Sequence, residues 1–185
     1  MTDPTTDPTP AEPAAVEPDL KDWTWTLRRT CPECGFTASE VSGPEVAGRL
    51  RALTEPWAAV LARPDATRRP SPTTWSPLEY ACHVRDVCRV FTERVDAMLG
   101  EDGVAFPNWD QDATAVQERY HAQDPSVVAG ELAEAAADAQ AAFAAVEDGQ
   151  WSLTGVRSDG SVFTVESLGQ YFLHDLAHHL VDVRA

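Results

Sequence analysis

Residues 76–100 read SPLEYACHVRDVCRVFTERVDAMLG. Ser76 is a favoured helix N-cap, Pro77 suits the first helical position, and Glu79 completes a capping box with Ser76. Apolar side chains then recur at three- and four-residue steps, and Gly100 stands where such a helix is expected to end. The stretch therefore predicts a long amphipathic helix with one face turned to a core.

Three further segments have helical periodicity. One covers residues 44–61, a second begins at Asp124 and a third begins near Thr164. Each carries one apolar stripe, so we expect an all-α fold, a four-helix bundle, in which the connection at 100–124 is long enough to cross the bundle. Residues 147–163 contain glycine breakers and predict a turn with short extended pieces. Periodicity alone leaves the order of the helices around the core open.

The N-terminal part of the chain differs in composition from the rest. Residues 1–19 are rich in Pro, Thr and acidic side chains, which predicts a disordered tail. Residues 20–43 form an extension with a Cys-x-x-Cys motif, and three large apolar side chains alternate over 23–27, a pattern that predicts a short extended segment. The bundle domain is then expected to occupy residues 44–185.

The charge of the chain narrows the classes of function. It has 30 acidic and 14 basic side chains and a formal net charge of −16. Such a surface repels phosphate backbones and anionic lipids, so we expect neither nucleic acid nor a membrane as a partner. No stretch approaches the roughly 18 apolar residues that span a bilayer, and the N-terminus lacks the features of a secretory signal. The expected location is therefore the cytoplasm.

Three of the five histidines lie in the last helical segment. His174 and His178 are separated by about 40° around a helix, so both imidazoles can reach one ion at roughly 2.0–2.1 Å. His179 lies about 140° from His174 and is expected to point elsewhere. His83 falls on the inward stripe of its own helix, where it can meet the pair. Three protein ligands leave coordination positions open, which is typical of a catalytic metal site.

A plainer interpretation of these histidines stays open. A pair of histidines four residues apart also occurs on helices as surface or capping side chains, so His174 and His178 could be ordinary residues. Asp175 stands where a His-Glu-x-x-His motif has its glutamate. Because aspartate has a shorter reach, the sequence does not indicate a metalloprotease-type base.

The cysteines offer a second candidate site. Cys31 and Cys34, followed by glycine, have the shape of a zinc knuckle, but one knuckle supplies two of the four ligands that structural zinc needs. Cys82 and Cys88 lie about 240° apart around one helix and cannot complete the site together. A single Cys, His or acidic side chain from elsewhere could still join it. Packed or turn-forming thiols, a shared second metal site and a redox pair all stay open.

Three motifs together resemble the DinB/YfiT-like family of metal-dependent proteins. They are Trp-Ser-Pro-x-Glu-x-x-x-His at 75–83, Trp-Asp at 109–110, and His-Asp-x-x-His-His-Leu at 174–180. The resemblance covers residues 44–185 and implies a four-helix bundle with an up-down-down-up order. It also implies a divalent ion, most often zinc or nickel, bound by His83, His174 and His178.

The resemblance also implies a chemistry. Relatives use low-molecular-weight thiols such as mycothiol or bacillithiol in S-transferase or isomerase reactions, so a mycothiol-type thiol and a small electrophile are the expected partners. The ion would act as a Lewis acid that lowers the pKa of the thiol. Asp110 would orient a water or an imidazole near the ion, unless it is a solvated loop acid. Arg85, Arg89 and Arg119 are the nearest cations in sequence for the carboxylates of such a thiol.

Two other classes of function stay open beside this enzyme. The chain could be a non-catalytic metal-binding or small-ligand-binding stress protein, or an interaction module whose histidines are incidental. Three convergent metal ligands favour an enzyme. The sequence shows no obvious general base, which argues against a catalytic function. Antiparallel bundles of this size often pair, so a homodimer is a further expectation.

Overall fold

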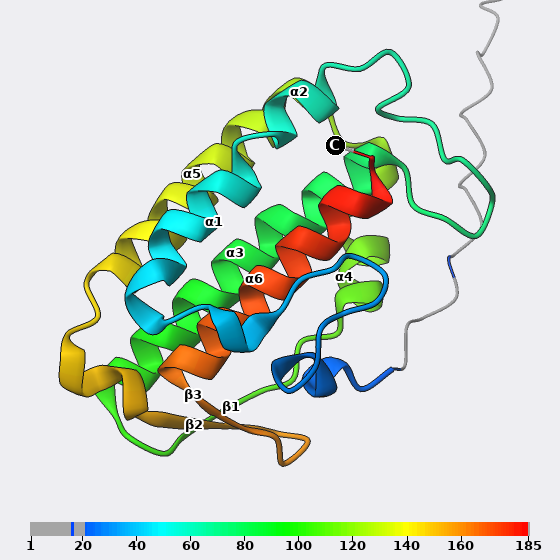
Figure 1. The fold of residues 1–185 in the computed structure, drawn as a ribbon. Coiled ribbons are helices and arrows are strands. Elements are labelled where there is room, and N and C mark those ends of the chain that lie inside the picture. The colour runs from blue at the N-terminus through cyan, green and yellow to red at the C-terminus, as the bar shows by residue number, and fades with distance from the viewer. Residues whose placement is uncertain (1–15, 17–20, 185) are drawn as a thin grey trace, which may run out of the picture.

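The computed structural model describes residue 16 and residues 21–184 of the 185-residue chain. The tail predicted at residues 1–19 therefore lies, apart from Val16, outside the described residues. The described part is mostly helical, and a small sheet lies at one end of the helical rods (Figure 1). The α-helices are α1 (Val46–Thr54), α2 (Trp57–Leu61), α3 (Pro77–Gly100), α4 (Gln111–Gln117), α5 (Pro125–Ala144) and α6 (Val165–Asp182).

The bundle consists of four rods, namely α1 continued by α2, α3, α5 and α6 (Figure 1). In Figure 1, α1 and α6 run in one direction along the bundle, and α3 and α5 run in the other. Helix α5 packs against α1 and α3, and α6 packs against the same two helices. Along the chain the directions are therefore up, down, down and up.

The helix starts that the sequence predicts are present. The Ser76 N–H and hydroxyl both donate to Glu79 Oε2, and Ser76 Oγ accepts the Glu79 N–H at the start of α3. Asp124 and Thr164 accept backbone N–H groups at the starts of α5 and α6. Gly169 lets α6 lie close to α1, because an added Cβ would come within 2.9 Å of an α1 side chain. The capping signals therefore mark the starts of α3, α5 and α6 correctly.

The first rod departs from the continuous helix predicted over residues 44–61. It begins as a 3-10 turn at Gly43–Glu45, α1 then ends at Thr54, and α2 starts at Trp57. Pro56 lies in the gap, and proline has no N–H to donate to the hydrogen bond that an unbroken helix needs there. Trp57 is buried, so α2 still contributes to the core.

The fold is not all-α, because two connections contain strands. The strands are β1 (Val104–Phe106), β2 (Thr154–Arg157) and β3 (Val162–Thr164). They form one sheet in the order β1-β2-β3, with β1 parallel to β2 and β2 antiparallel to β3. Val104 pairs with Gly155, where a Cβ would collide with Phe106 and Met98. The extended pieces within 147–163 agree with the prediction, whereas the sequence pattern does not predict β1.

The connection between α3 and α5 carries the chain back along the bundle (Figure 1). It contains β1, α4 and a 3-10 turn at Tyr120–Ala122. Tyr120 is fully buried, and its hydroxyl donates a hydrogen bond to Asp86 of α3. The connection is therefore anchored in the core beside α3.

The N-terminal extension forms 3-10 turns, so the extended segment predicted at 23–27 is wrong. Trp23–Leu27 is the first turn, and Asp22 caps it by accepting the Thr24 N–H. Further turns follow at Ala38–Glu40 and Gly43–Glu45, and all three contact α6. The alternation of large side chains reflects this packing on α6 and does not indicate a strand.

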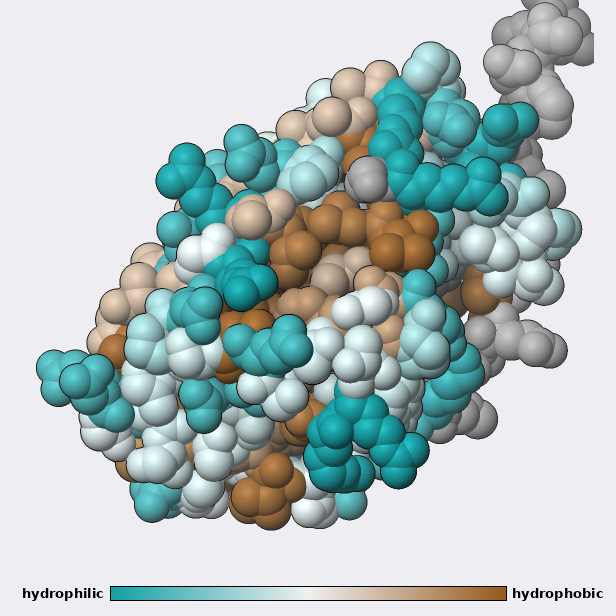
Figure 2. Space-filling view, in the orientation of Figure 1, coloured by the Kyte–Doolittle hydropathy of each residue, from teal (hydrophilic) through white to brown (hydrophobic). Residues whose placement is uncertain are grey.

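Hydrophobic side chains fill the space between the rods. The largest fully buried side chains include Trp57, Phe143, Phe172 and Leu168. Figure 2 shows that hydrophobic residues also gather at the surface between α1, α2 and the C-terminal end of α6, with hydrophilic residues around them. Within the described part of the chain, no helix combines the length and the apolar character needed to cross a membrane.

Candidate metal centres

Helix α6 carries two overlapping pairs of possible metal ligands. His174 and His178 are four residues apart, and so are Asp175 and His179. Side chains four residues apart share one helix face, and the two faces differ by about 100° because the pairs are offset by one residue. One pair meets α3, and the other meets the N-terminal extension. Helix α6 therefore lies between two groups of ligands.

The first group, which we call the His–Asp group, consists of His83, Asp175 and His179. Their possible ligand atoms all lie within 4.8 Å of one another. Asp175 Oδ1 lies 3.4 Å from His83 Nε2 and 3.7 Å from His179 Nε2. The ring centroids of His83 and His179 are 4.7 Å apart. Two imidazoles and one carboxylate are a ligand set of catalytic zinc sites, where water or substrate takes the remaining position.

Buried atoms of the His–Asp group lack hydrogen-bond partners in the described part of the protein. His83 is fully buried, and neither of its ring nitrogens makes a hydrogen bond to a described residue. The same is true of Asp175 Oδ1. Burying polar atoms without partners destabilises a protein. A divalent ion coordinated by His83 and Asp175 would supply the missing interaction, so these residues fit a metal ion.

Electrostatics and packing both favour binding of a metal ion by the His–Asp group. Burial acts to raise the pKa of Asp175, but nearby His179 and His83 outweigh it and hold the pKa at about 2. The carboxylate is therefore negatively charged at neutral pH, as a divalent cation requires. Trp75 and Trp109 flank His83 with ring centroids 5.5 Å away, and the Trp109 ring is stacked on the imidazole. These rings restrict the orientation of His83.

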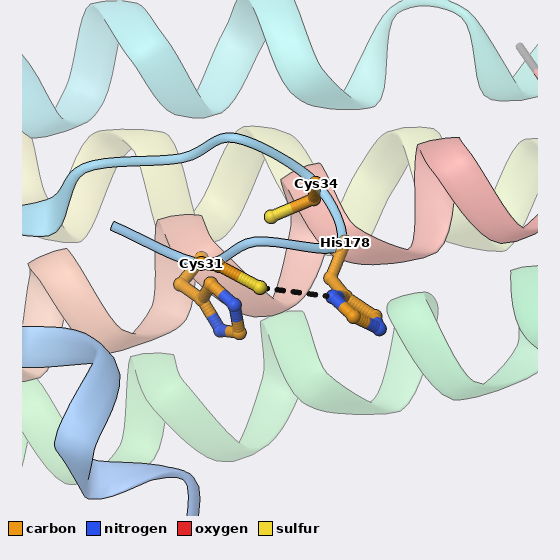
Figure 3. Close-up of side chains that lie close together, drawn as sticks. Cys31, Cys34 and His178 are labelled. Carbon is orange, nitrogen blue, oxygen red and sulfur yellow. Dashed lines mark hydrogen bonds between the residues drawn. The ribbon is translucent and has the colours of Figure 1, made fainter. Parts of the chain in front are cut away.

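The second group, which we call the Cys–His group, consists of Cys31, Cys34, His174 and His178. Their possible ligand atoms also lie within 4.8 Å of one another. Figure 3 shows Cys31 and Cys34 on the loop beside His178, and the Cys31 Sγ is 3.8 Å from His178 Nδ1. Cys31 and His174 are buried, and both cysteines are free thiols. Two thiols and two imidazoles therefore meet from distant parts of the sequence.

The Cys-x-x-Cys loop is held in shape by its own backbone. The Gly35 N–H donates to the Cys31 carbonyl at 2.8 Å, and the Cys31 N–H donates to the Phe36 carbonyl at 2.9 Å. Gly35 has a φ of 75°, which glycine adopts without a steric penalty. The two thiols are therefore presented from a preformed turn.

Burial also sets the protonation of the Cys–His group. It lowers the pKa of His174 to about 4, so the neutral imidazole that binds metals prevails at neutral pH. It raises the pKa of the Cys34 thiol to about 11, and neighbouring Cys31 adds to that increase. Metal ligation requires thiolates, so binding of an ion there would release protons.

The three histidines predicted to share one ion are not brought together. His83 belongs to the His–Asp group, whereas His174 and His178 belong to the Cys–His group. His179, which was expected to point elsewhere, is the histidine that meets His83. The physical reason is the rotation of α6, because a rotation of about 100° decides which of the two pairs faces α3. The i,i+4 spacing of Asp175 and His179 is a sequence signal for this pair. A pattern that considers histidines alone does not include Asp175.

A pocket of about 270 Å³ opens beside both groups. Asp175 and His179 line it from the His–Asp group, and His174 and His178 line it from the Cys–His group. Other side chains around it are aromatic or charged, among them Trp23, Trp75, Tyr80, Tyr171, Lys21, Glu33 and Asp182. A small molecule in this pocket would therefore contact side chains of both groups.

Other residues proposed from the sequence belong to neither group of ligands. Asp110 is exposed and caps α4, where its Oδ1 accepts the Ala113 N–H at 2.9 Å. In this structure Asp110 is therefore the N-cap of α4. Arg85 donates to both oxygens of Asp86 at 2.9 and 3.0 Å, and Arg89 donates to the same carboxylate. Arg85 and Arg89 are therefore engaged with acidic side chains, Asp86 for both and Glu131 of α5 for Arg85 as well. A different cation, Lys21, lines the pocket.

Comparisons with known proteins agree with the helical bundle. A family model described as the DinB superfamily matches residues 47–182. The chain is similar to the solved structure of YfiT from Bacillus subtilis, which is described as a probable metal-dependent hydrolase with an unusual four-helix bundle topology. The TM-score is 0.64 at 19% sequence identity, and the similarity covers 80% of this chain and 85% of that chain. No curated protein matches this chain.

Proposed function

This chain belongs to the DinB superfamily, and on that premise we propose that it is a metal-dependent enzyme whose divalent ion is held by His83, Asp175 and His179. One observation carries the proposal. The three side chains converge within 4.8 Å beside a pocket, and buried ring nitrogens and a carboxylate oxygen among them make no hydrogen bond within the described residues. Perturbed and unsatisfied polar groups that converge at a pocket are typical of functional sites.

The side chains around the ion site prepare it for chemistry. A bound zinc or nickel ion would supply a Lewis acid that lowers the pKa of a coordinated thiol or water. Trp109 and Trp75 pack on His83 and exclude water from its buried side. Asp175 keeps a negative charge between the two imidazoles. His179 is partly exposed and lies at the pocket, so substrate approaches the group from that side.

We further propose that the reaction is S-transfer or isomerisation of a small electrophile with a mycothiol-type thiol. The composition of the pocket supports this class of substrates. Its aromatic walls suit a small apolar electrophile, and Lys21 together with polar side chains suits the charged and hydroxylated part of a thiol cofactor. Thiolate attack would then take place where the pocket reaches Asp175 and His179.

Hydrolysis is the second candidate function, and the similarity to YfiT favours it. That protein is described as a probable metal-dependent hydrolase. In this chain the same three ligands would then serve a water molecule in place of a thiol. The two candidates share the ion site and differ in the nucleophile and in the class of substrate.

Elemental analysis of the purified protein tests the ion site. His83→Ala should remove the ion of the His–Asp group, and His174→Ala should remove only metal bound at the Cys–His group. His121→Ala, a change outside both groups, should keep the metal content of the wild type. The double variant separates this assignment from a single ion shared by His83, His174 and His178. Two independent ions predict that the double variant loses more metal than either single variant, whereas one shared ion predicts equal losses in all three.

Turnover assays test the reaction. Metal-free and reloaded protein would be offered mycothiol with a panel of electrophiles and, separately, a panel of esters and amides without thiol. We expect thiol consumption that depends on zinc or nickel and is lost in His83→Ala. Hydrolysis without thiol would establish the second candidate. If an ion is bound and neither panel turns over, the enzyme proposal is wrong and a non-catalytic metal-binding protein is the better conclusion.

A further inference from the structure

The cysteines of the N-terminal extension take no part in the proposed function, yet they lie directly against α6. We propose that Cys31, Cys34, His174 and His178 form a closed structural zinc centre that fastens the N-terminal extension to α6. The centre uses none of the ligands of the His–Asp group, so it does not rest on the proposed function.

The distances fit one tetrahedral ion. Bond lengths of about 2.3 Å to sulfur and about 2.0–2.1 Å to nitrogen place the ligand atoms of tetrahedral zinc roughly 3.3–3.8 Å apart. Cys31 Sγ and His178 Nδ1 are separated by 3.8 Å, and all four ligand atoms lie within 4.8 Å of one another. Small movements of side chains would therefore close the ligand shell.

The kinds and spacing of the ligands favour zinc in a structural role. Two residues separate Cys31 from Cys34, and three residues separate His174 from His178. Thiolate and imidazole pairs at these spacings are typical of structural zinc sites with two cysteines and two histidines. Four protein ligands leave no position for water or substrate, so this ion would support the fold.

An unpaired buried nitrogen points independently to a bound ion. His174 is 4% exposed, and its Nε2 is buried without a hydrogen-bond partner in the part of the chain that the structure describes. Cys31 is fully buried beside it. A buried polar atom of this kind destabilises the fold unless something binds it. A zinc ion shared with the two thiolates would engage one ring nitrogen of this buried imidazole.

The surroundings of His178 resemble the second layer of a metal site. Its Nδ1 faces Cys31, and its Nε2 lies 3.5 Å from the carboxylate of Glu33. Histidines that bind metals commonly offer their other ring nitrogen to a carboxylate, which fixes the tautomer and the ring orientation. Glu33 comes from the same loop as the two cysteines, so this loop would supply both ligands and their support.

The zinc centre would also complete a wall of the pocket. Trp23 covers both histidines, with ring centroids 5.6 Å from His174 and 5.1 Å from His178. Trp23 and Glu33 line the pocket. The turns of the extension pack along α6, and Gln170 Nε2 of α6 donates to the Val41 carbonyl at the far end of the extension. Fastening the loop to α6 would therefore hold that wall in place.

Cobalt substitution of the full chain tests the centre directly. Reduced wild-type protein loaded with Co²⁺ should show thiolate-to-cobalt charge-transfer bands together with the strong visible bands of a tetrahedral ion. Cys31→Ser and Cys34→Ser should each remove most of the charge-transfer intensity. Cys82→Ser changes a buried thiol outside the group and should leave the bands intact. His83→Ala should also leave the thiolate-to-cobalt charge-transfer bands intact, whether or not the His–Asp group binds an ion.

X-ray absorption of the wild-type zinc protein gives a second measurement that does not depend on the folding of any variant. We expect sulfur ligands together with nitrogen ligands in the zinc shell. A zinc shell without sulfur, or charge-transfer bands that persist in both Cys31→Ser and Cys34→Ser, would overturn the proposal. Loss of catalytic turnover with unchanged bands would instead concern the proposed function alone.

Discussion

The His–Asp group and the Cys–His group lie on adjacent faces of one helix, yet they are assembled from different parts of the chain. The first joins α6 to α3 within the bundle, with three nitrogen and oxygen ligands. The second joins α6 to a loop, and Cys31 and His178 are 147 residues apart in sequence. A bundle alone can build the first group, whereas the second exists only when the N-terminal extension is docked. The number and kind of ligands then suggest a catalytic ion in the His–Asp group and a structural ion in the Cys–His group.

A third polar cluster shows that buried charge does not by itself indicate a ligand. Arg85, Asp86 and Tyr120 are buried near the same end of α3, but protein atoms satisfy them. Arg85 donates to Asp86 and also to Glu131 at 2.6 Å, and the Tyr120 hydroxyl donates to Asp86. The informative difference is therefore that, among the described residues, buried nitrogens of His83 and His174 have no hydrogen-bond partner.

The largest difference is expected between two neighbouring residues of α6. His179→Ala removes a ligand of the His–Asp group and should lower kcat/KM about 1,000-fold, because a Lewis-acid ion stabilises a transition state by several kcal/mol. His178→Ala removes a ligand of the Cys–His group and should lower kcat/KM only on the order of tenfold, by displacing a pocket wall. Its main effect should be a lower Tm. Steady-state kinetics and calorimetry of both variants measure this, and equal losses of turnover would contradict the division of roles.

Asp86→Asn tests the cluster that needs no ion. It should destabilise the fold by about 3 kcal/mol, because it weakens a buried ion pair, and should lower Tm by roughly 6–12 °C. Metal content should not change, in contrast to variants of either metal group. Calorimetry and elemental analysis of the same samples make the comparison, and a loss of metal would show that this cluster supports the ion sites.

The same variant has a defined pH dependence. Burial acts to raise the pKa of Asp86, but hydrogen bonds from Arg85 and Tyr120 outweigh it, so the pKa lies below its ordinary value of 3.8. Stability from a carboxylate with a lowered pKa is fully present above the ordinary value and is lost as pH falls through the folded-state value. The stability difference between wild type and Asp86→Asn should therefore shrink below about pH 4. A difference that is constant down to pH 2 would contradict this.

Local sequence signals predict the rods but not the rotation of α6. Ser76, Asp124 and Thr164 mark helix starts through chemistry that acts within a few residues. The sequence contains both pairs of ligands on α6, but which pair faces α3 depends on packing of the whole bundle. Histidine spacing therefore predicts that His174 and His178 join His83, whereas the structure places Asp175 and His179 beside His83.

The sequence pattern likewise does not predict contacts between distant parts of the chain. The knuckle at Cys31 and Cys34 predicts half of a zinc site, but its partners lie on the last helix. Strand β1 pairs with β2 about 50 residues later, and three-residue strands carry too little periodicity to be recognised. Pro56 is a local signal for the break between α1 and α2. The apolar stripe continues across the break and by itself predicts one unbroken helix.

Removal of zinc should release the N-terminal extension while the bundle persists. Arg28 and Arg29 are exposed next to the cysteine loop, so trypsin should cut there about 10–100 times faster after chelation, as local opening becomes more frequent. Arg68, exposed in the connection before α3, serves as a control whose cleavage should change little. Mass spectrometry of timed digests gives both rates. An equal increase at Arg68 would mean that chelation loosens the whole protein.

The smallest expected effect concerns the support of His178. Glu33→Gln keeps the shape of the side chain but removes the charge that faces His178 Nε2, so zinc affinity at the Cys–His group should fall about tenfold. Glu33 is 56% exposed, and the screening of an exposed charge by water keeps the effect small. Competition with a chromophoric chelator measures the affinity, and Glu40→Gln, an exposed change elsewhere in the extension, should have no effect. An unchanged affinity in Glu33→Gln would limit Glu33 to lining the pocket, and the Cys–His group would then depend on its four ligands alone.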